Sequence, residues 1–82
     1  MPKRKQIGER NLIGQTVVHL RNLNDMDQQE LLTKLQIKGI DISQPSLSRL
    51  EGQKREASDR EVLALSQIFQ VPMERLFQPP EE

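Results

Sequence analysis

One stretch of the chain combines hydrogen-bonding side chains with the features of a short helix. Residues 43–51 read Ser-Gln-Pro-Ser-Leu-Ser-Arg-Leu-Glu. Ser43 can accept a hydrogen bond from a backbone N–H of the first helical turn, and proline is tolerated in that turn. Leu47 and Leu50 lie three residues apart and share one face. The residues left for the helix start and the exposed face are Gln44, Pro45, Ser46, Ser48 and Arg49.

These residue types suit a helix that approaches the edges of DNA bases. Arginine prefers the O6 and N7 atoms of guanine, and glutamine prefers the N6 and N7 atoms of adenine. Pro45 offers no polar group but could touch a thymine methyl group. The alternative interpretation is a capped surface helix whose polar side chains only face water. The stretch by itself does not decide between the two.

Composition limits the classes of function that remain. The chain has 82 residues, of which 34% are hydrophobic, so we expect one small domain. It has no cysteine and a single histidine, His19, which excludes disulfides and zinc sites built from cysteine or clustered histidine. The carboxylates fall at expected helix caps and tails, without a histidine or cysteine partner. We therefore expect no enzyme activity, no metal and no cofactor.

Charge and hydropathy favour a chain that works in the cytoplasm. No apolar run approaches the ~20 residues needed to cross a membrane, and no signal-peptide pattern appears. The formal net charge is zero, which is unusual for a nucleic-acid-binding domain. A neutral total can nevertheless hide a basic face. Basic residues occur at Lys3, Arg4, Lys5, Lys54 and Arg55, whereas Glu81 and Glu82 are acidic.

The elements that must position residues 43–51 are predicted to be helices. Ile13, Val17 and Leu20 follow helical spacing and predict a helix over about 11–23, with Asn11 as a possible N-cap. Gly14 lies inside this segment, at a cost of roughly 1 kcal/mol against alanine. Either Gly14 permits close packing, or the helix begins nearer residue 15.

Two capping boxes predict the starts of two further helices. Asp27 with Glu30 opens a helix over about 28–36, and Ser58 with Glu61 opens one over about 59–69. Pro72 suits the start of a short last helix over 73–77. The resulting organisation is all-α, with a basic tail at 1–10, one domain at 11–78 and an acidic tail at 79–82.

The order of these parts resembles the helix-turn-helix family of phage repressors, Cro proteins and Xre-like bacterial regulators. The resemblance is carried by Gln28-x-Glu30-Leu31, by residues 43–51 and by Leu65-Ser66-x-x-Phe69-x-Val71, and it covers about 13–77. It implies a compact five-helix bundle with a helix-turn-helix, in which the third helix lies in the major groove.

Carried over by position, the resemblance assigns roles to individual residues. Gln44, Pro45 and Arg49 fall at base-reading positions, with Ser46 and Ser48 beside them. Gln28 looks like the glutamine that binds a phosphate, and Arg21 with Glu51 matches a partly buried ion pair. Further phosphate contacts are expected from Lys38, Lys54 and Arg55. Dimerisation is expected through Met73, Leu76 and Phe77.

The chain also departs from the family pattern. The family joins helix two to helix three in about three to four residues, and here the connection after Leu35 is longer by roughly five. Because Ile37, Ile40 and Ile42 are apolar, we expect Ile42 and at least one of the others to pack under the helices. Gln70 replaces a usual glycine, so a left-handed non-glycine residue is expected there.

The sequence therefore predicts a sequence-specific binder of double-stranded DNA that acts as a small transcriptional regulator, in particular a repressor. Its partner would be an operator of palindromic sequence, and the chain would form a homodimer or dimerise only on DNA. The alternative is an antitoxin or protein-interaction module built on the same fold.

Overall fold

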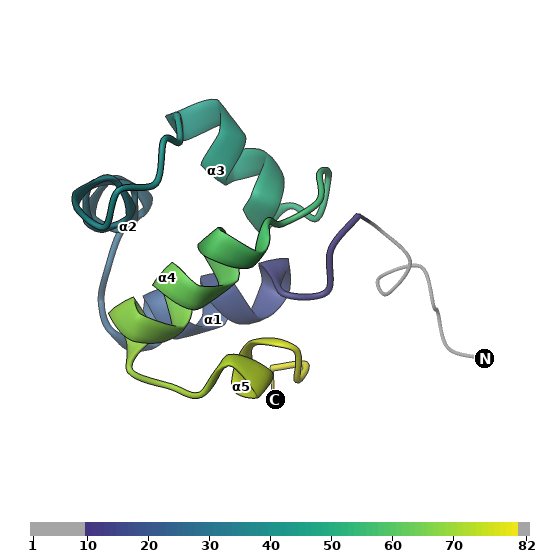
Figure 1. Cartoon of the computed structure of the whole chain (residues 1–82). Helices are drawn as coiled ribbons and strands as arrows, with labels where there is room; N and C mark the ends of the chain where they lie inside the picture. The colour runs from purple at the N-terminus through teal and green to yellow at the C-terminus, as the bar shows by residue number, and fades with distance from the viewer. Residues whose placement is uncertain (1–9, 81–82) are drawn as a thin grey trace.

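The computed structural model describes residues 10–80, which fold into five α-helices without a strand (Figure 1). The predicted all-α class is confirmed. The predicted N-terminal tail, apart from Arg10, and the last two residues lie outside the described part. The helices are α1 (Gly14–Leu23), α2 (Gln28–Ile37), α3 (Gln44–Glu51), α4 (Asp59–Phe69) and α5 (Met73–Leu76).

Three helices begin at the predicted N-caps. Asp27 accepts a hydrogen bond from the backbone N–H of Glu30 at 2.8 Å, and Glu30 accepts one from Asp27 at 3.0 Å. Ser58 and Glu61 form the same reciprocal pair at 3.1 and 2.9 Å. Ser43 accepts from the backbone N–H of Ser46 at 3.3 Å. Local sequence chemistry therefore sets where α2, α3 and α4 start.

The start of α1 reconciles the two alternatives that the sequence left open. The helix begins at Gly14, and the side-chain oxygen of Asn11 accepts from the backbone N–H groups of Ile13 and Gly14 at 3.0 and 2.8 Å. A Cβ atom on Gly14 would lie 2.6 Å from the carbonyl oxygen of Leu50 and 2.7 Å from that of Glu51. Glycine is therefore required because α1 packs directly against the end of α3.

Three helices end next to a left-handed residue that is not glycine, and after α1 this residue is Asp25, at φ 52°. Gln70 ends α4 with φ 58°, as the sequence predicted. Gly52 is the C-cap of α3, also as predicted, but it keeps φ −85°, and the positive angle, φ 60°, falls on Gln53. Gln53 is buried, so its side chain contributes packing or hydrogen bonds that a glycine at this position could not provide.

All five helices contribute to one core. In Figure 1, α2 is seen along its axis and α3 from the side, so the two helices cross, and α4 runs in front of α1. Burying each large apolar side chain contributes roughly 1.5–3 kcal/mol. The core consists of Ile13, Val17, Leu20, Leu31, Leu32, Leu35, Ile42, Leu47, Leu50, Ala64, Leu65, Phe69 and Leu76.

The connection between α2 and α3 is held by specific contacts. Gly39 adopts φ 91°, and the N–H of Ile40 returns to the carbonyl of Leu35 at 3.0 Å. Ile42 is buried and Ile40 packs against the core, which confirms the expectation for these two residues. Ile37 instead ends α2 and is 79% exposed. The extra residues are thus divided between a longer α2 and an ordered turn.

Within residues 10–80, no helix has both the length and the apolar character needed to cross a membrane.

Candidate nucleic-acid interface

The outer face of α3 is polar and accessible, whereas its inner face belongs to the core. Leu47 and Leu50 are 0% and 1% exposed. Ser46 is half-buried at the edge of the outer face. Because Glu51 is buried, the exposed charge of α3 is positive and comes from Arg49. The other predicted base readers are exposed: Gln44, Pro45, Ser48 and Arg49.

The structure joins Arg21 to Glu51, as the family resemblance implied. The Nε and Nη2 groups of Arg21 donate to the two carboxylate oxygens of Glu51 at 2.8 and 3.0 Å. Nη1 of Arg21 also donates to the carbonyl of Met26 at 3.1 Å. The two charged side chains are only 14% and 7% exposed. This ion pair ties the end of α1 and the α1–α2 turn to the end of α3.

Gln28 connects the ion pair to the exposed face of α3. Its Nε2 donates to Glu51 at 3.0 Å, and its Oε1 accepts from Gln44 at 2.9 Å and from Ser48 at 3.3 Å. A carboxylate can only accept, so the amide nitrogen must face Glu51 and the amide oxygen must face outward. Gln28 thereby holds two predicted base readers in defined positions.

The other predicted phosphate contacts divide into two kinds. Lys38, the C-cap residue after α2, and Lys54, which follows α3, are both exposed and can reach a ligand. Arg55 is different, because its side chain is directed between α3 and α4 and is only 21% exposed. The expectation that Arg55 clamps a phosphate does not fit this placement.

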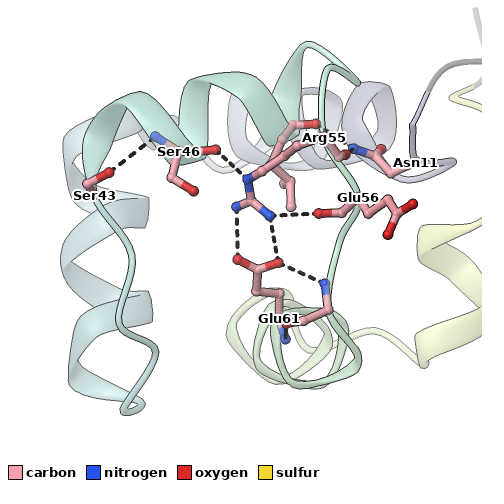
Figure 2. Close-up of polar contacts among 8 residues, drawn as sticks. Asn11, Ser43, Ser46, Arg55, Glu56 and Glu61 are labelled. Atoms are coloured by element: carbon pink, nitrogen blue, oxygen red, sulfur yellow. Dashed lines mark hydrogen bonds and ion pairs between the residues drawn. The ribbon is translucent and has the colours of Figure 1, made fainter.

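Arg55 uses its guanidinium within the protein (Figure 2). Nε donates to the carbonyl of Ser46 at 3.0 Å, and Nη1 donates to the carbonyl of Glu56 at 2.8 Å. Nη1 and Nη2 also donate to the two carboxylate oxygens of Glu61 at 3.0 and 2.8 Å. A guanidinium has five N–H donors, and four of them are used in these bonds to residues in the described part of the chain.

Glu61 is both the capping residue of α4 and the partner of Arg55. Burial raises its pKa, but hydrogen bonds from Arg55 and Ser58 and the positive charge of Arg55 outweigh burial, so the pKa lies below its ordinary value. Sequence reasoning found only the capping role. The spacing from Arg55 to Glu61 crosses a loop and a helix start, so no helical or strand period marks it.

A third polar group, also missed in sequence, holds the start of α1 against α3. The side-chain nitrogen of Asn11 donates to the carbonyls of Leu50 at 3.0 Å and Arg55 at 2.8 Å. Gln53 donates to the carbonyl of Asn11 at 3.1 Å. Asn11 and Gln53 are 8% exposed each, so these bonds satisfy groups that water cannot reach. The bond to Asn11 explains why a glutamine and not a glycine occupies the left-handed position 53.

The predicted dimer residues do not form one exposed set. Met73 and Phe77 are 46% and 47% exposed, but Leu76 is 0% exposed and belongs to the core. The assignment of Leu76 to an interface is therefore wrong, since its position on the short α5 faces α4. The third exposed apolar side chain near Met73 and Phe77 is Leu12, which is 52% exposed. Hollows of about 420 and 620 Å³ border this surface, and both are lined by Leu12 and Phe77.

Comparison of the chain with protein-family models, curated proteins and solved structures found no match. Among the described residues, no group of three or more His, Asp or Glu side chains is placed to hold a metal ion. The functional interpretation therefore depends on the arrangement of side chains around α3.

Proposed function

We propose that the chain binds double-stranded DNA in a sequence-specific manner and acts as a small transcriptional repressor. In this proposal α2 and α3 form a helix-turn-helix of the phage repressor, Cro and Xre type, and α3 enters the major groove. Gln44, Ser48 and Arg49 contact base edges, with Ser46 and Pro45 beside them. The protein acts on DNA in the cytoplasm.

The observation that carries the proposal is the connection from a buried ion pair to the polar face of α3. A buried ion pair roughly offsets its own desolvation, so Arg21 and Glu51 are not explained by net stability alone. Through Gln28, the pair is hydrogen-bonded to Gln44 and Ser48. Side chains that are already held in place by hydrogen bonds lose less conformational entropy on binding. Such preorganisation favours the reading of bases.

The donors and acceptors that remain on Gln44 match an adenine. One N–H of its amide is used by Gln28. The second N–H and the amide oxygen remain, and this is the pair that glutamine uses toward N7 and N6 of adenine. Arg49 supplies the positive charge and the fork suited to guanine. Lys38 and Lys54 are exposed and suited to phosphates, and backbone N–H groups at the N-terminal end of α2 could add to them, whereas the side chain of Gln28 turns its amide nitrogen toward Glu51.

Specificity in this proposal requires two copies of the chain. One short helix reads only a few base pairs, which is too little to distinguish an operator from competing sites. We therefore propose a homodimer on a palindromic operator, formed by the surface that includes Met73 and Phe77.

Selection of bound sequences from random duplex DNA tests the proposed function. The expected result is a palindromic consensus whose binding weakens steeply as salt increases, because phosphate contacts release counterions. The matched control is the Arg49→Ala, Gln44→Ala double variant, which keeps the buried ion pair and should enrich no consensus. Failure of the wild-type chain to enrich any sequence at low salt would refute the proposal.

The second candidate is an antitoxin or another protein-interaction module on the same fold. It is favoured by the exposed apolar side chains of Leu12, Met73 and Phe77, which border two hollows. Salt-dependent duplex binding by the isolated chain supports the first candidate. Binding to a protein partner that is lost in Phe77→Ser but kept in Arg49→Ala supports the second.

A further inference from the structure

The polar groups of Arg55 contact two helices, α3 and α4, and the segment that leads into α1. Its guanidinium binds the Ser46 carbonyl of α3 and the Glu61 carboxylate of α4 (Figure 2). Its own backbone carbonyl accepts from Asn11, whose side-chain oxygen accepts from the backbone of Ile13 and Gly14 at the start of α1; the N-cap residue itself is Ile13, not Asn11 as the sequence had suggested. Arg55, which lies in the loop between α3 and α4, is therefore held to both of these helices by its side chain and to Asn11 by its backbone carbonyl.

The contact with α3 falls within the proposed recognition helix. Ser46 lies beside Gln44 and Ser48, so a bond to its carbonyl acts on the part of α3 that carries the proposed base readers. The bonds from Arg21 to Glu51 and from Asn11 to the carbonyl of Leu50 hold α3 at its C-terminal end. Attachments at different points along a helix constrain its tilt, which an attachment at one point cannot do, and Arg55 adds one nearer the N-terminal end.

The charges explain why Arg55 is poorly suited to leave this position. Glu61 is 7% exposed, and moving the guanidinium to a phosphate would leave its carboxylate buried without its cationic partner. Lysine could provide a point charge at a phosphate, but it cannot serve Ser46 and both oxygens of Glu61 at once. The geometry therefore uses the fork of Arg55 rather than its charge alone.

We propose that Arg55 and Glu61 are positioning residues that set the tilt of α3 for base reading, and that Arg55 is not a phosphate contact. This inference rests on the proposed function of DNA binding. It adds to that function a pair of residues that touch no DNA and yet control its specificity.

Three variants separate positioning from contact. Glu61→Gln removes the negative charge that faces Arg55. It keeps an amide oxygen that can still accept from the backbone N–H of Ser58, so the cap of α4 is retained. Arg55→Lys keeps the charge but loses the fork. The third variant combines Arg55→Lys with Glu61→Gln. Asp59→Asn, on the exposed start of α4, is the control for the loss of one negative charge.

The measurement is the affinity of each variant for the selected operator and for a random duplex, over a range of salt concentrations. It is made at a temperature where circular dichroism shows each variant to be fully folded, so that a loss of fold is not counted as a loss of binding. We expect Glu61→Gln and Arg55→Lys each to weaken operator binding at least about tenfold, the equivalent of one lost base contact. The double variant should be no worse. Random-duplex binding and the salt slope should match those of Asp59→Asn for Glu61→Gln and for the double variant, and those of the wild type for Arg55→Lys.

Two results would overturn the inference while leaving DNA binding intact. One is that Glu61→Gln and Arg55→Lys both bind the operator as tightly as the wild type. The pair would then have no role in base reading. The other concerns a fourth variant, Arg55→Gln, which removes the positive charge: a uniform loss on all sequences with a salt slope lower by about one would mark Arg55 as a phosphate contact. If the wild-type chain binds no duplex, the proposed function fails first, and the positioning role fails with it.

Discussion

The guanidinium of Arg21 and the carboxylate of Glu51 are joined by two hydrogen bonds, at 2.8 and 3.0 Å, although the residues are 30 positions apart. The pair is largely shielded from water, and Gln28 completes it with a third bond to Glu51. Charged pairs of this kind fix geometry more than they add net stability. The pair therefore determines how the end of α3 is presented relative to α1.

Removing one member of this pair should destabilise the fold strongly. We expect Arg21→Met and Glu51→Gln each to lower the free energy of unfolding by about 3–5 kcal/mol, because the remaining partner is left buried and uncompensated. The double variant should recover part of the loss. Urea unfolding at low temperature measures each value. Arg60→Met, at an exposed position, is the control, and additive losses below about 0.5 kcal/mol per variant would mean that the pair contributes nothing.

Gly14→Ala should be destabilising, although alanine is the better helix former by roughly 1 kcal/mol. Its Cβ would lie 2.6 and 2.7 Å from two backbone carbonyl oxygens at the end of α3, which cannot rotate away. We expect a cost of about 1–3 kcal/mol, as for other overpacked contacts. Gly52→Ala is the matched control, because its nearest atom would be 3.4 Å away. Equal unfolding midpoints for the two variants would contradict this account of α1 and α3.

The sequence predicted the helices well where the signal is local. The Asp27, Ser43 and Ser58 caps each depend on residues within three positions, and all three are present in the structure. The left-handed Gln70 and the burial of Ile42 were also predicted. These features are set by backbone chemistry and hydropathy in a short window, which a single sequence reveals directly.

The long-range polar contacts were not predictable from the residues alone. Arg55 and Lys54 are adjacent basic residues in one loop, and only the fold shows that Arg55 faces Glu61 while Lys54 is exposed. Leu76 and Phe77 are likewise adjacent apolar residues, and the orientation of the four-residue α5 decides that Leu76 is buried. The Arg21–Glu51 pair was reached through family resemblance, because nothing local marks it.

Acid should weaken the fold through Glu61. Its pKa is lower in the folded chain than its ordinary value of 4.5, so the folded state favours the carboxylate. The stabilisation is present above the unfolded pKa and is lost as pH falls through the lower folded value. Unfolding by urea between pH 7 and pH 3 should therefore show the wild type losing its advantage over Glu61→Gln in acid. A difference between the two that stays constant with pH would contradict this.

The exposed residues Arg49 and Lys54 should behave differently on DNA. If Arg49 reads a base as proposed, Arg49→Ala should cost about 1–3 kcal/mol on the operator and relax the preference at one base pair. Lys54→Ala should weaken binding to all sequences alike and lower the salt slope by about one. Neither change should alter the unfolding midpoint. If Arg49→Ala weakened every duplex equally, Arg49 would be a phosphate contact and not a base reader.

The surface formed by Leu12, Met73 and Phe77 should control assembly on DNA. Phe77→Ser removes a large side chain that is 47% exposed, so it should weaken the dimer with little effect on the fold. Sedimentation with operator DNA should show two wild-type chains per palindrome, with half-sites about 34 Å apart. The variant should need a higher protein concentration to reach that complex. Leu63→Ser is the matched control, because Leu63 is 48% exposed on α4 and lines neither hollow. A strictly 1:1 wild-type complex would refute the dimer, and an equal effect of both variants would place the interface elsewhere.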